Sequence, residues 1–152
     1  MSLPLRSLAN GLTIARAVAG LPLILALQAD AAALAWWLLL MAGLSDAADG
    51  WLARRAGGGS SWGARLDPLT DKVLIAAPLL WLAAAGTLPL WAVWLLLARE
   101  LLISGWRSQA GDGGPASLAG KAKTVLQFLA LLLMLWPPSW SGHQQLLVAG
   151  WW

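Results

Sequence analysis

The chain has 152 residues, of which 59% are hydrophobic and only 11% are charged. An ordinary soluble domain carries about 25% charged residues, so this composition argues against a soluble protein and favours one with several membrane-spanning helices. The sequence has no cysteine and one histidine, which excludes disulfides, thiolate metal sites and multi-histidine metal sites within one chain. We expect an all-α fold, a polytopic membrane helical bundle that forms a single domain over residues 1–152, with no nucleic-acid partner.

Apolar runs predict five spans, which short polar or glycine-rich connections separate. Residues 1–10 come first as a juxtamembrane segment, and the spans are expected at about 12–29, 33–55, 64–85, 90–107 and 118–136. Asp30 with its neighbouring alanines predicts the first turn, and the segment from Gly86 to Pro89 predicts a later one. Residues 145–152 would rise about 12 Å as a helix, against a hydrocarbon core of about 30 Å, so we expect a truncated, partial sixth span.

The basic residues predict how the chain is oriented. When the predicted spans are threaded through a bilayer, all ten fall on one side, whereas the opposite turns hold Asp30 and His143. The positive-inside rule then places the N-terminus and the basic residues at the cytoplasmic face of the inner (plasma) membrane. The ten are Arg6, Arg16, Arg54, Arg55, Arg65, Lys72, Arg99, Arg107, Lys121 and Lys123.

Four of the seven acidic residues lie between Ser45 and Lys72, in or beside apolar sequence. Asp46 and Asp49 are three residues apart, and Asp67 and Asp71 are four apart, so each pair shares one face of a helix. If the two helices pack through these faces, four carboxylates meet, and they repel one another unless a cation lies between them. This arrangement of oxygen ligands predicts a site for one or two divalent cations.

Eight identities at fixed gaps extend this pattern. It reads Asp46-x2-Asp49-Gly50-x2-Ala53-Arg54-x8-Gly63-x3-Asp67-x3-Asp71. The pattern resembles the signature of the CDP-alcohol phosphatidyltransferases, with every fixed position and gap filled. A second element, Asn10-x2-Thr13-x2-Arg16, is similar to an element in the first span of that family. The resemblance covers the chain from about Leu8 to Trp136.

The resemblance implies a fold and a reaction. The fold is a six-helix membrane enzyme whose spans surround a polar cavity open to the cytoplasm, and its sixth helix commonly contributes to a dimer contact, so a homodimer is expected. In the reaction, an acceptor alcohol displaces CMP from a CDP-linked lipid. The whole site would therefore lie at the cytoplasmic face, with the lipid bilayer around it.

The resemblance also implies a role for each motif residue. Asp46, Asp49 and Asp67 would be ligands of two Mg²⁺ or Mn²⁺ ions. Asp71 would be a ligand and also the general base that takes the proton of the acceptor hydroxyl. The CDP-binding residues would be Gly50, Ala53, Arg54 and Gly63, extended by Asn10, Thr13 and Arg16. From the residues themselves, Gly50 would let the substrate approach closely, and the planar fork of Arg54 suits a phosphate.

The acceptor is predicted from two further segments. Those that begin at Arg99-Glu100 and at Gly120 (GKAKT) look like segments of bacterial phosphatidylglycerophosphate synthases, which join CDP-diacylglycerol to glycerol 3-phosphate. Candidate ligands for the acceptor phosphate are Arg107, Lys121, Lys123, Lys72 and Arg99. Alternatives stay open, because the lysines at 121 and 123 could anchor a helix at the cytoplasmic face, and Arg99-Glu100 could be a satisfied ion pair. Asp112 and His143 are expected to be solvated loop residues.

Other functions are compatible with part of this pattern. A related transferase could use serine, inositol phosphate or phosphatidylglycerol as its acceptor, and the cations would then bind a different group. A divalent-cation transporter would explain the carboxylates but would leave Gly50 and Arg54 without a role. An inactive membrane scaffold is the third alternative, which the intact motif argues against.

Overall fold

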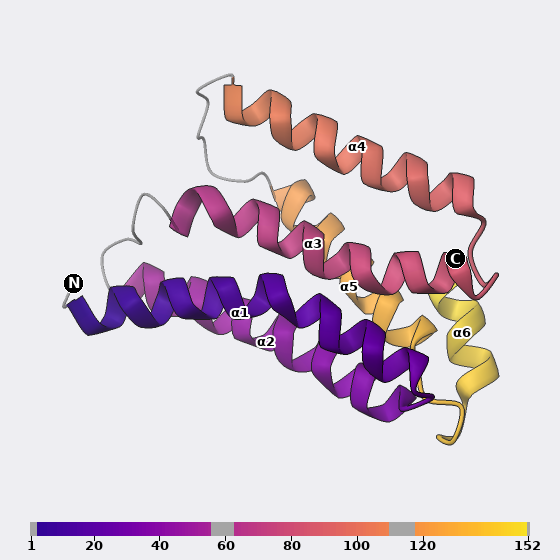
Figure 1. The fold of residues 1–152 in the computed structure, drawn as a ribbon. Helices are drawn as coiled ribbons and strands as arrows, with labels where there is room; N and C mark the ends of the chain where they lie inside the picture. The colour runs from indigo at the N-terminus through magenta and orange to yellow at the C-terminus, as the bar shows by residue number, and fades with distance from the viewer. Residues whose placement is uncertain (1–2, 56–62, 110–117, 152) are drawn as a thin grey trace. The chain divides into compact units, whose positions relative to one another are not determined.

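The computed structural model describes residues 3–55, 63–109 and 118–151. Over these ranges the chain forms helices and turns without any strand, so the all-α fold is confirmed (Figure 1). The helices are α1 (Leu3–Gln28), α2 (Ala32–Arg55), α3 (Gly63–Ala84), α4 (Leu90–Gln109), α5 (Leu118–Met134) and α6 (His143–Trp151). Residues 3–10, expected to form a juxtamembrane segment, are the first turns of α1.

Two compact units make up the chain, residues 1–77 and residues 78–152. The boundary falls inside α3, so the first unit holds α1, α2 and the first part of α3. The second unit holds the end of α3 together with α4, α5 and α6. The predicted single-domain organisation stays a prediction, and each unit is described separately below.

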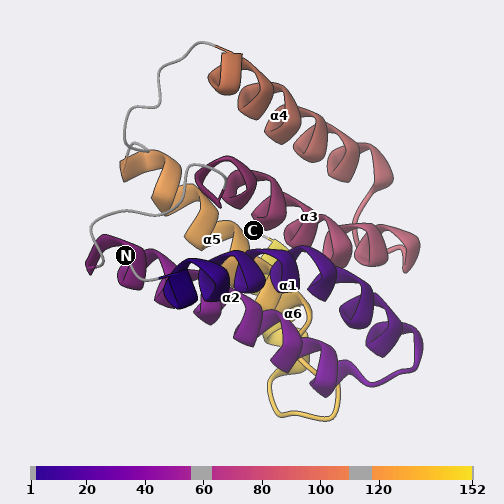
Figure 2. The same cartoon turned by 60° about the vertical axis from the view of Figure 1, so that its left-hand side comes forward.

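In the first unit, α1 and α2 form an antiparallel hairpin whose helices lie side by side (Figure 2). The turn between them is built on Asp30, which has a positive φ of 54°. The Ala31 amide donates to the Ala26 carbonyl at 2.9 Å, and the Asp30 amide donates to the Leu27 carbonyl at 3.2 Å. These two hydrogen bonds form a turn that commonly closes the carboxyl end of a helix. The turn needs one residue in the left-handed conformation, which aspartate tolerates. The turn predicted at Asp30 is confirmed.

A second contact in the same unit joins α1 to α3. Gly20 of α1 is buried, and a Cβ placed on it would lie 3.1 Å from the Cβ of Ala77 and 3.7 Å from the Val73 carbonyl oxygen. The absence of a side chain at Gly20 therefore lets the backbones of α1 and α3 approach closely. Leu23 and Leu27, further along α1, are buried in the same unit, as is Leu39 of α2. The helix α1 consequently packs on both helices that carry the aspartate pairs.

In the second unit, a similar turn joins α3 to α4. Gly86 has a φ of 74°, the Thr87 amide donates to the Leu82 carbonyl at 2.9 Å, and the Gly86 amide donates to the Ala83 carbonyl at 3.1 Å. Pro89 precedes α4, where its missing amide hydrogen costs nothing. This turn was also expected from the sequence, because glycine adopts a positive φ without strain.

The short helix α6 packs on α5. A Cβ on Gly150 would lie 2.6 Å from the Cγ of Met134 and 2.8 Å from the Ala130 carbonyl, so only glycine allows this approach. The indole of Trp151 donates to the Thr87 carbonyl at 3.1 Å. His143, expected to be a solvated loop residue, instead begins α6, and its Nδ1 lies 2.6 Å from the Trp136 carbonyl. That expectation was wrong because the chain turns back after Pro137 and carries His143 onto the end of α5.

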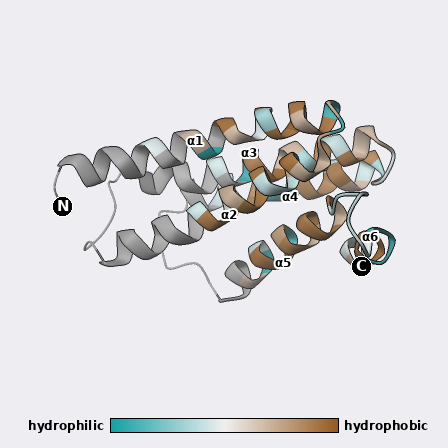
Figure 3. Cartoon of the chain, turned by 90° about the horizontal axis from the view of Figure 1, so that it is seen from below, coloured by the Kyte–Doolittle hydropathy of each residue, from teal (hydrophilic) through white to brown (hydrophobic). Residues whose placement is uncertain are grey.

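Hydrophobic side chains cover much of the described surface as well as the core. Brown, hydrophobic residues predominate along α5 after its grey start (Figure 3). On α4, the tryptophans Trp91, Trp94 and Trp106 are each more than 60% exposed. Within residues 3–55, 63–109 and 118–151, none of the helices has both the length and the apolar character needed to cross a bilayer.

Candidate functional site

The eight-residue motif lies on two helices of the first unit. Asp46 and Asp49 fall in the second half of α2, and Asp67 and Asp71 fall in the first turns of α3. The helical backbone therefore places each pair at positions that share one helix face, as the spacing predicts. The side chains of all four aspartates lie outside the described part of the structure, so their role as metal ligands stays a prediction.

The chemistry of these residues suits a hard divalent cation. All four are carboxylates, and Mg²⁺ and Mn²⁺ prefer oxygen ligands. The three-residue and four-residue spacings both occur on helical backbone, as two converging pairs of carboxylates would require. Among the side chains that the structure describes, no three acidic or histidine residues gather elsewhere into a competing metal site. The predicted donor set therefore fits the implied metal.

Two polar side chains beside the motif are buried. Arg16 of α1 is only 3% exposed, and Thr70 of α3, between Asp67 and Asp71 in the sequence, is 7% exposed. Arg16 is four residues before Gly20, so it shares the helix face with which α1 meets α3. A buried guanidinium is stable only where oxygen acceptors take its hydrogens, and carboxylate and phosphate oxygens accept the strongest of these hydrogen bonds. The position of Arg16 accordingly suits the phosphate-binding role that the sequence predicts for it.

The remaining predicted CDP-binding residues lie on the same three helices. Their backbone is helical, whereas their side chains lie outside the described part, so the predicted contacts are untested. They are Asn10 and Thr13 on α1, Gly50, Ala53 and Arg54 on α2, and Gly63 at the start of α3.

In the second unit, one carboxylate joins two of the predicted acceptor cations. Oε1 of Glu100 on α4 accepts a hydrogen bond from the Lys123 ammonium group on α5. The same oxygen lies 3.2 Å from a guanidinium nitrogen of its neighbour Arg99. The Glu100 side chain is 20% exposed, against 39% for Lys123, so the contact is partly shielded from water. This ion pair fixes the face of α5 that is turned toward α4.

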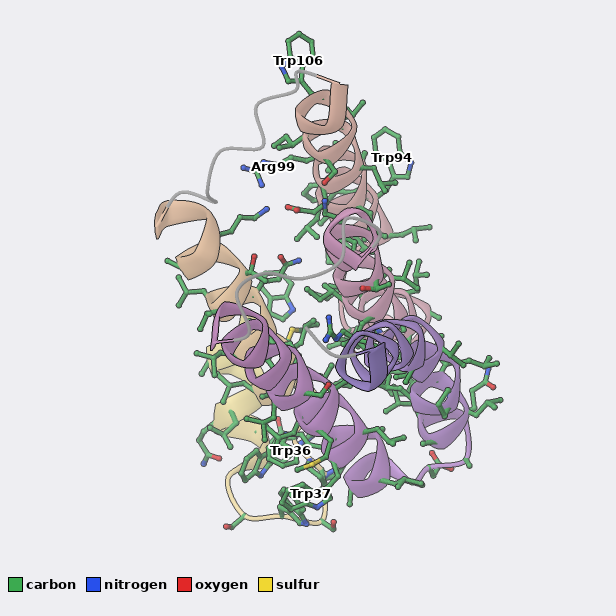
Figure 4. All side chains as sticks on the ribbon, turned by 90° about the vertical axis from the view of Figure 1, so that its left-hand side faces the viewer. Trp36, Trp37, Trp94, Arg99 and Trp106 are labelled. Atoms are coloured by element: carbon green, nitrogen blue, oxygen red, sulfur yellow. The ribbon has the colours of Figure 1, made fainter. Side chains whose placement is uncertain are left out.

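Arg99 and Glu100 are consecutive residues of α4, and Glu100 contacts both Arg99 and Lys123 of α5. Arg99 and Trp94 project to opposite sides of α4 (Figure 4). The ion pair between Arg99 and Glu100, left open as an alternative by the sequence, is present and extends to Lys123. Lys72, another predicted acceptor cation, belongs to the first unit, where it is half-buried on α3. Arg107 and Lys121 have side chains outside the described part.

Sequence reasoning missed two features of this cluster. It paired Glu100 with Arg99 but not with Lys123, since the two residues are 23 positions apart and meet only through packing. It also gave no role to Gln127, which follows Lys123 by four residues and so lies on the same face of α5. A polar residue one turn after a lysine within an otherwise apolar run was the available signal.

Comparison with known proteins agrees with the motif. The family model for CDP-alcohol phosphatidyltransferase matches residues 6–152. A protein named probable phosphatidylglycerophosphate synthase from Mycobacterium tuberculosis is 38% identical over 145 residues, which cover 90% of this chain and 69% of the relative. A Rickettsia felis protein named CDP-diacylglycerol–glycerol-3-phosphate 3-phosphatidyltransferase is 33% identical over 151 residues, 95% of this chain and 83% of the relative.

A relative of the same name from Bacillus subtilis is 34% identical over 101 residues, 64% of this chain and 52% of the relative. The family predicted from the spacing of the aspartates is thus confirmed, and the names of these relatives agree with the subfamily predicted from the segments at Arg99 and Gly120. The motif on α2 and α3, the extent of the match and these identities establish that the chain belongs to the CDP-alcohol phosphatidyltransferase family.

Proposed function

We propose that this protein is a phosphatidylglycerophosphate synthase, which transfers a phosphatidyl group from CDP-diacylglycerol to glycerol 3-phosphate and releases CMP. The observation that carries the proposal is the complete motif on regular helix at Asp46, Asp49, Asp67 and Asp71. The names of relatives that align with most of this chain support the choice of acceptor.

The reaction is a displacement at phosphorus. A hydroxyl oxygen of glycerol 3-phosphate forms a bond to the phosphorus that carries the diacylglycerol, and the bond from that phosphorus to the oxygen of CMP breaks. Asp71 takes the proton of the attacking hydroxyl, and together with Asp46, Asp49 and Asp67 it would hold the divalent ions. Bound Mg²⁺ or Mn²⁺ would neutralise charge on the pyrophosphate oxygens and stabilise the leaving phosphate.

Arg16 orients the anionic end of the CDP-lipid. Of the predicted nucleotide-site residues it is the one whose side chain the structure describes, it is buried, and it lies on the face of α1 that meets α3. A guanidinium held in this way donates several parallel hydrogen bonds to phosphate oxygens and loses little entropy when it does so. Arg54, on α2, would add a second guanidinium, and Gly50 would leave room for the nucleotide.

The cations of the second unit recognise the phosphate of the acceptor. Arg99 and Lys123 share one carboxylate, Glu100, so this group of three carries one excess positive charge. That excess attracts an anionic acceptor more than an uncharged one such as serine. Arg107 and Lys121 would raise the excess further, and a dianionic phosphate matches such a group.

We also place the protein in the inner membrane with the motif facing the cytoplasm. The support is the apolar composition and the location of all the basic residues on one side of the predicted threading. Because the chain has no cysteine, single cysteines report topology without background. We expect Gly58→Cys to react with a membrane-impermeant thiol reagent only after the inner membrane is opened, and Asp30→Cys and Ser139→Cys to react in intact spheroplasts. The opposite labelling pattern would contradict this orientation.

The function itself is tested by an acceptor scan. Purified protein in detergent receives CDP-diacylglycerol, Mg²⁺ and one acceptor at a time, and CMP release is measured. We expect release with glycerol 3-phosphate and its loss after chelation of the metal. Release only with serine, inositol phosphate or phosphatidylglycerol would keep the family but contradict the proposed acceptor. No release with any acceptor would support the inactive scaffold.

A further inference from the structure

The ion pair between α4 and α5 sets the orientation of a second polar residue. Because Lys123 is bound to Glu100, the face of α5 that carries Lys123 is the face turned toward α4. Gln127 is four residues further along and shares that face. The next residue on it, Leu131, is 2% exposed, so the face passes from charged through polar to apolar along the helix.

Gln127 holds a buried hydrogen-bond donor. Its side-chain amide nitrogen is shielded from solvent, and in the described part of the chain it has no hydrogen-bond partner. Since the oxygen and nitrogen of an amide are interchangeable by a flip of the group, the firm observation is an unsatisfied amide end at this depth. Such a group costs stability, whereas an apolar side chain of the same shape at this position would not. A ligand that accepts the hydrogen bond removes this cost.

The neighbouring charges indicate the chemistry of that ligand. Lys123 lies one helical turn before Gln127 and forms a group with Arg99 and Glu100 that carries one excess positive charge. Such a group suits the phosphate of a small molecule. A part of the ligand that lies one helical turn from the phosphate would contact the Gln127 amide. An amide can donate a hydrogen bond to a hydroxyl and accept one from it. A phosphate and a hydroxyl separated in this way describe a phosphorylated polyol, the class to which glycerol 3-phosphate belongs.

We propose that Gln127 is an acceptor-binding residue, which hydrogen-bonds a hydroxyl of the phosphorylated polyol while Lys123 binds its phosphate. The inference rests on the proposed function and goes beyond it by naming a residue that recognises the hydroxyl part of the acceptor. An ester carbonyl of the CDP-lipid could also accept a hydrogen bond from an amide. The experiment therefore measures the two substrates separately.

The test compares Gln127→Met with Gln145→Met. Methionine keeps the length and the helix propensity of glutamine but has no amide, and Gln145 is an exposed glutamine on α6 that serves as the control for the same chemical change. We expect Gln127→Met to raise the KM for glycerol 3-phosphate about tenfold, the loss expected for one hydrogen bond to substrate, and to change the KM for CDP-diacylglycerol less than about twofold. We expect Gln145→Met to leave both values unchanged.

Thermal unfolding without substrates separates binding from structure. If the Gln127 amide is hydrogen-bonded only when the ligand is bound, Gln127→Met should unfold at the same temperature as the wild type or at a higher one. The reason is that the substitution removes a buried, unsatisfied donor. A lower midpoint together with equal effects on both substrates would overturn the inference in favour of a structural role. A larger effect on CDP-diacylglycerol, or no effect on either KM, would overturn it as well. If the wild type releases no CMP with glycerol 3-phosphate, the proposed function fails and this inference fails with it.

Discussion

The two units differ in how their chemistry follows from the chain. In the first, the predicted metal site comes from one stretch between Ser45 and Lys72, and its logic is the register of two helices. In the second, the ion pair joins Glu100 of α4 to Lys123 of α5, residues that are 23 positions apart in the sequence. The spacing of residues along the sequence determines which of them share a helix face. A contact between two helices depends instead on how each helix is rotated and placed relative to the other. The predicted metal ligands are therefore readable from spacing, whereas the pairing of Lys123 with Glu100 is visible only in the structure.

The largest expected effect is at Asp71, because it is the predicted base. Asp71→Asn keeps the size and a metal-compatible oxygen but cannot take a proton. We expect CMP release to fall by about 10³-fold, within the range of general-base catalysis, while binding of CDP-diacylglycerol is retained. Single-turnover CMP release and equilibrium binding of the lipid measure the two properties. Asp30→Asn, in the turn between α1 and α2, is the matched control, and wild-type turnover in Asp71→Asn would disprove the assignment.

The second prediction concerns the dependence of turnover on the metal. Chelation should abolish turnover, and added Mg²⁺ or Mn²⁺ should restore it. Asp49→Asn should then raise the Mg²⁺ concentration for half-maximal activity by at least about tenfold, since a lost ligand weakens binding at least as much as a lost supporting contact does. A titration of activity against free Mg²⁺ measures this value. An unchanged metal requirement in Asp49→Asn would show that the first unit does not hold the ion through α2.

The second unit should respond in acceptor affinity. Lys123→Gln removes a charged hydrogen-bond donor, so we expect the KM for glycerol 3-phosphate to rise by about 10- to 100-fold, with kcat and the KM for CDP-diacylglycerol nearly unchanged. Arg55→Gln removes a basic residue that is not among the predicted substrate-binding residues, and it serves as the control. If both variants raise both KM values equally, the lysine acts through general surface charge and not through an acceptor site.

The smallest expected effect is at Glu100. Glu100→Gln keeps a hydrogen bond to Lys123 but removes the negative charge that holds it, and partly exposed ion pairs are worth about 0.5 to 1 kcal/mol. For a chain of this length that corresponds to a fall of about 1–4 °C in the unfolding midpoint. The measurement is thermal unfolding of the single variants and of the double variant with Lys123→Gln. Additive shifts would indicate that the two side chains do not interact.

The parts of the fold that the sequence predicts correctly are those determined by one residue or a short segment. Both turns at Asp30 and Gly86 were expected, because aspartate and glycine tolerate the positive φ that they have. The start of α1 at Leu3 was missed, since the amphipathic residues before Asn10 continue the helix without a break. The place of His143 on the end of α5 was missed because it depends on how the chain turns after Pro137.

The candidate site shows the same division. The aspartate pattern gave the family, which the family model and the relatives confirm. The pairing of Lys123 with Glu100 could not be read from the sequence, because nothing local fixes which faces of α4 and α5 meet. Gln127 is visible as a polar residue in an apolar run, but its buried, unsatisfied amide is a property of the packed structure alone.

The central claim is that this chain makes phosphatidylglycerophosphate through the aspartates on α2 and α3. Its most direct test is the transfer of label from radioactive glycerol 3-phosphate into extractable lipid, measured in parallel for the wild type and Asp71→Asn with CDP-diacylglycerol and Mg²⁺. We predict one labelled lipid with the mobility of phosphatidylglycerophosphate from the wild type, formed with equimolar CMP, and none from the variant. Equal labelling by both proteins, or labelling that needs no CDP-diacylglycerol, would contradict the account.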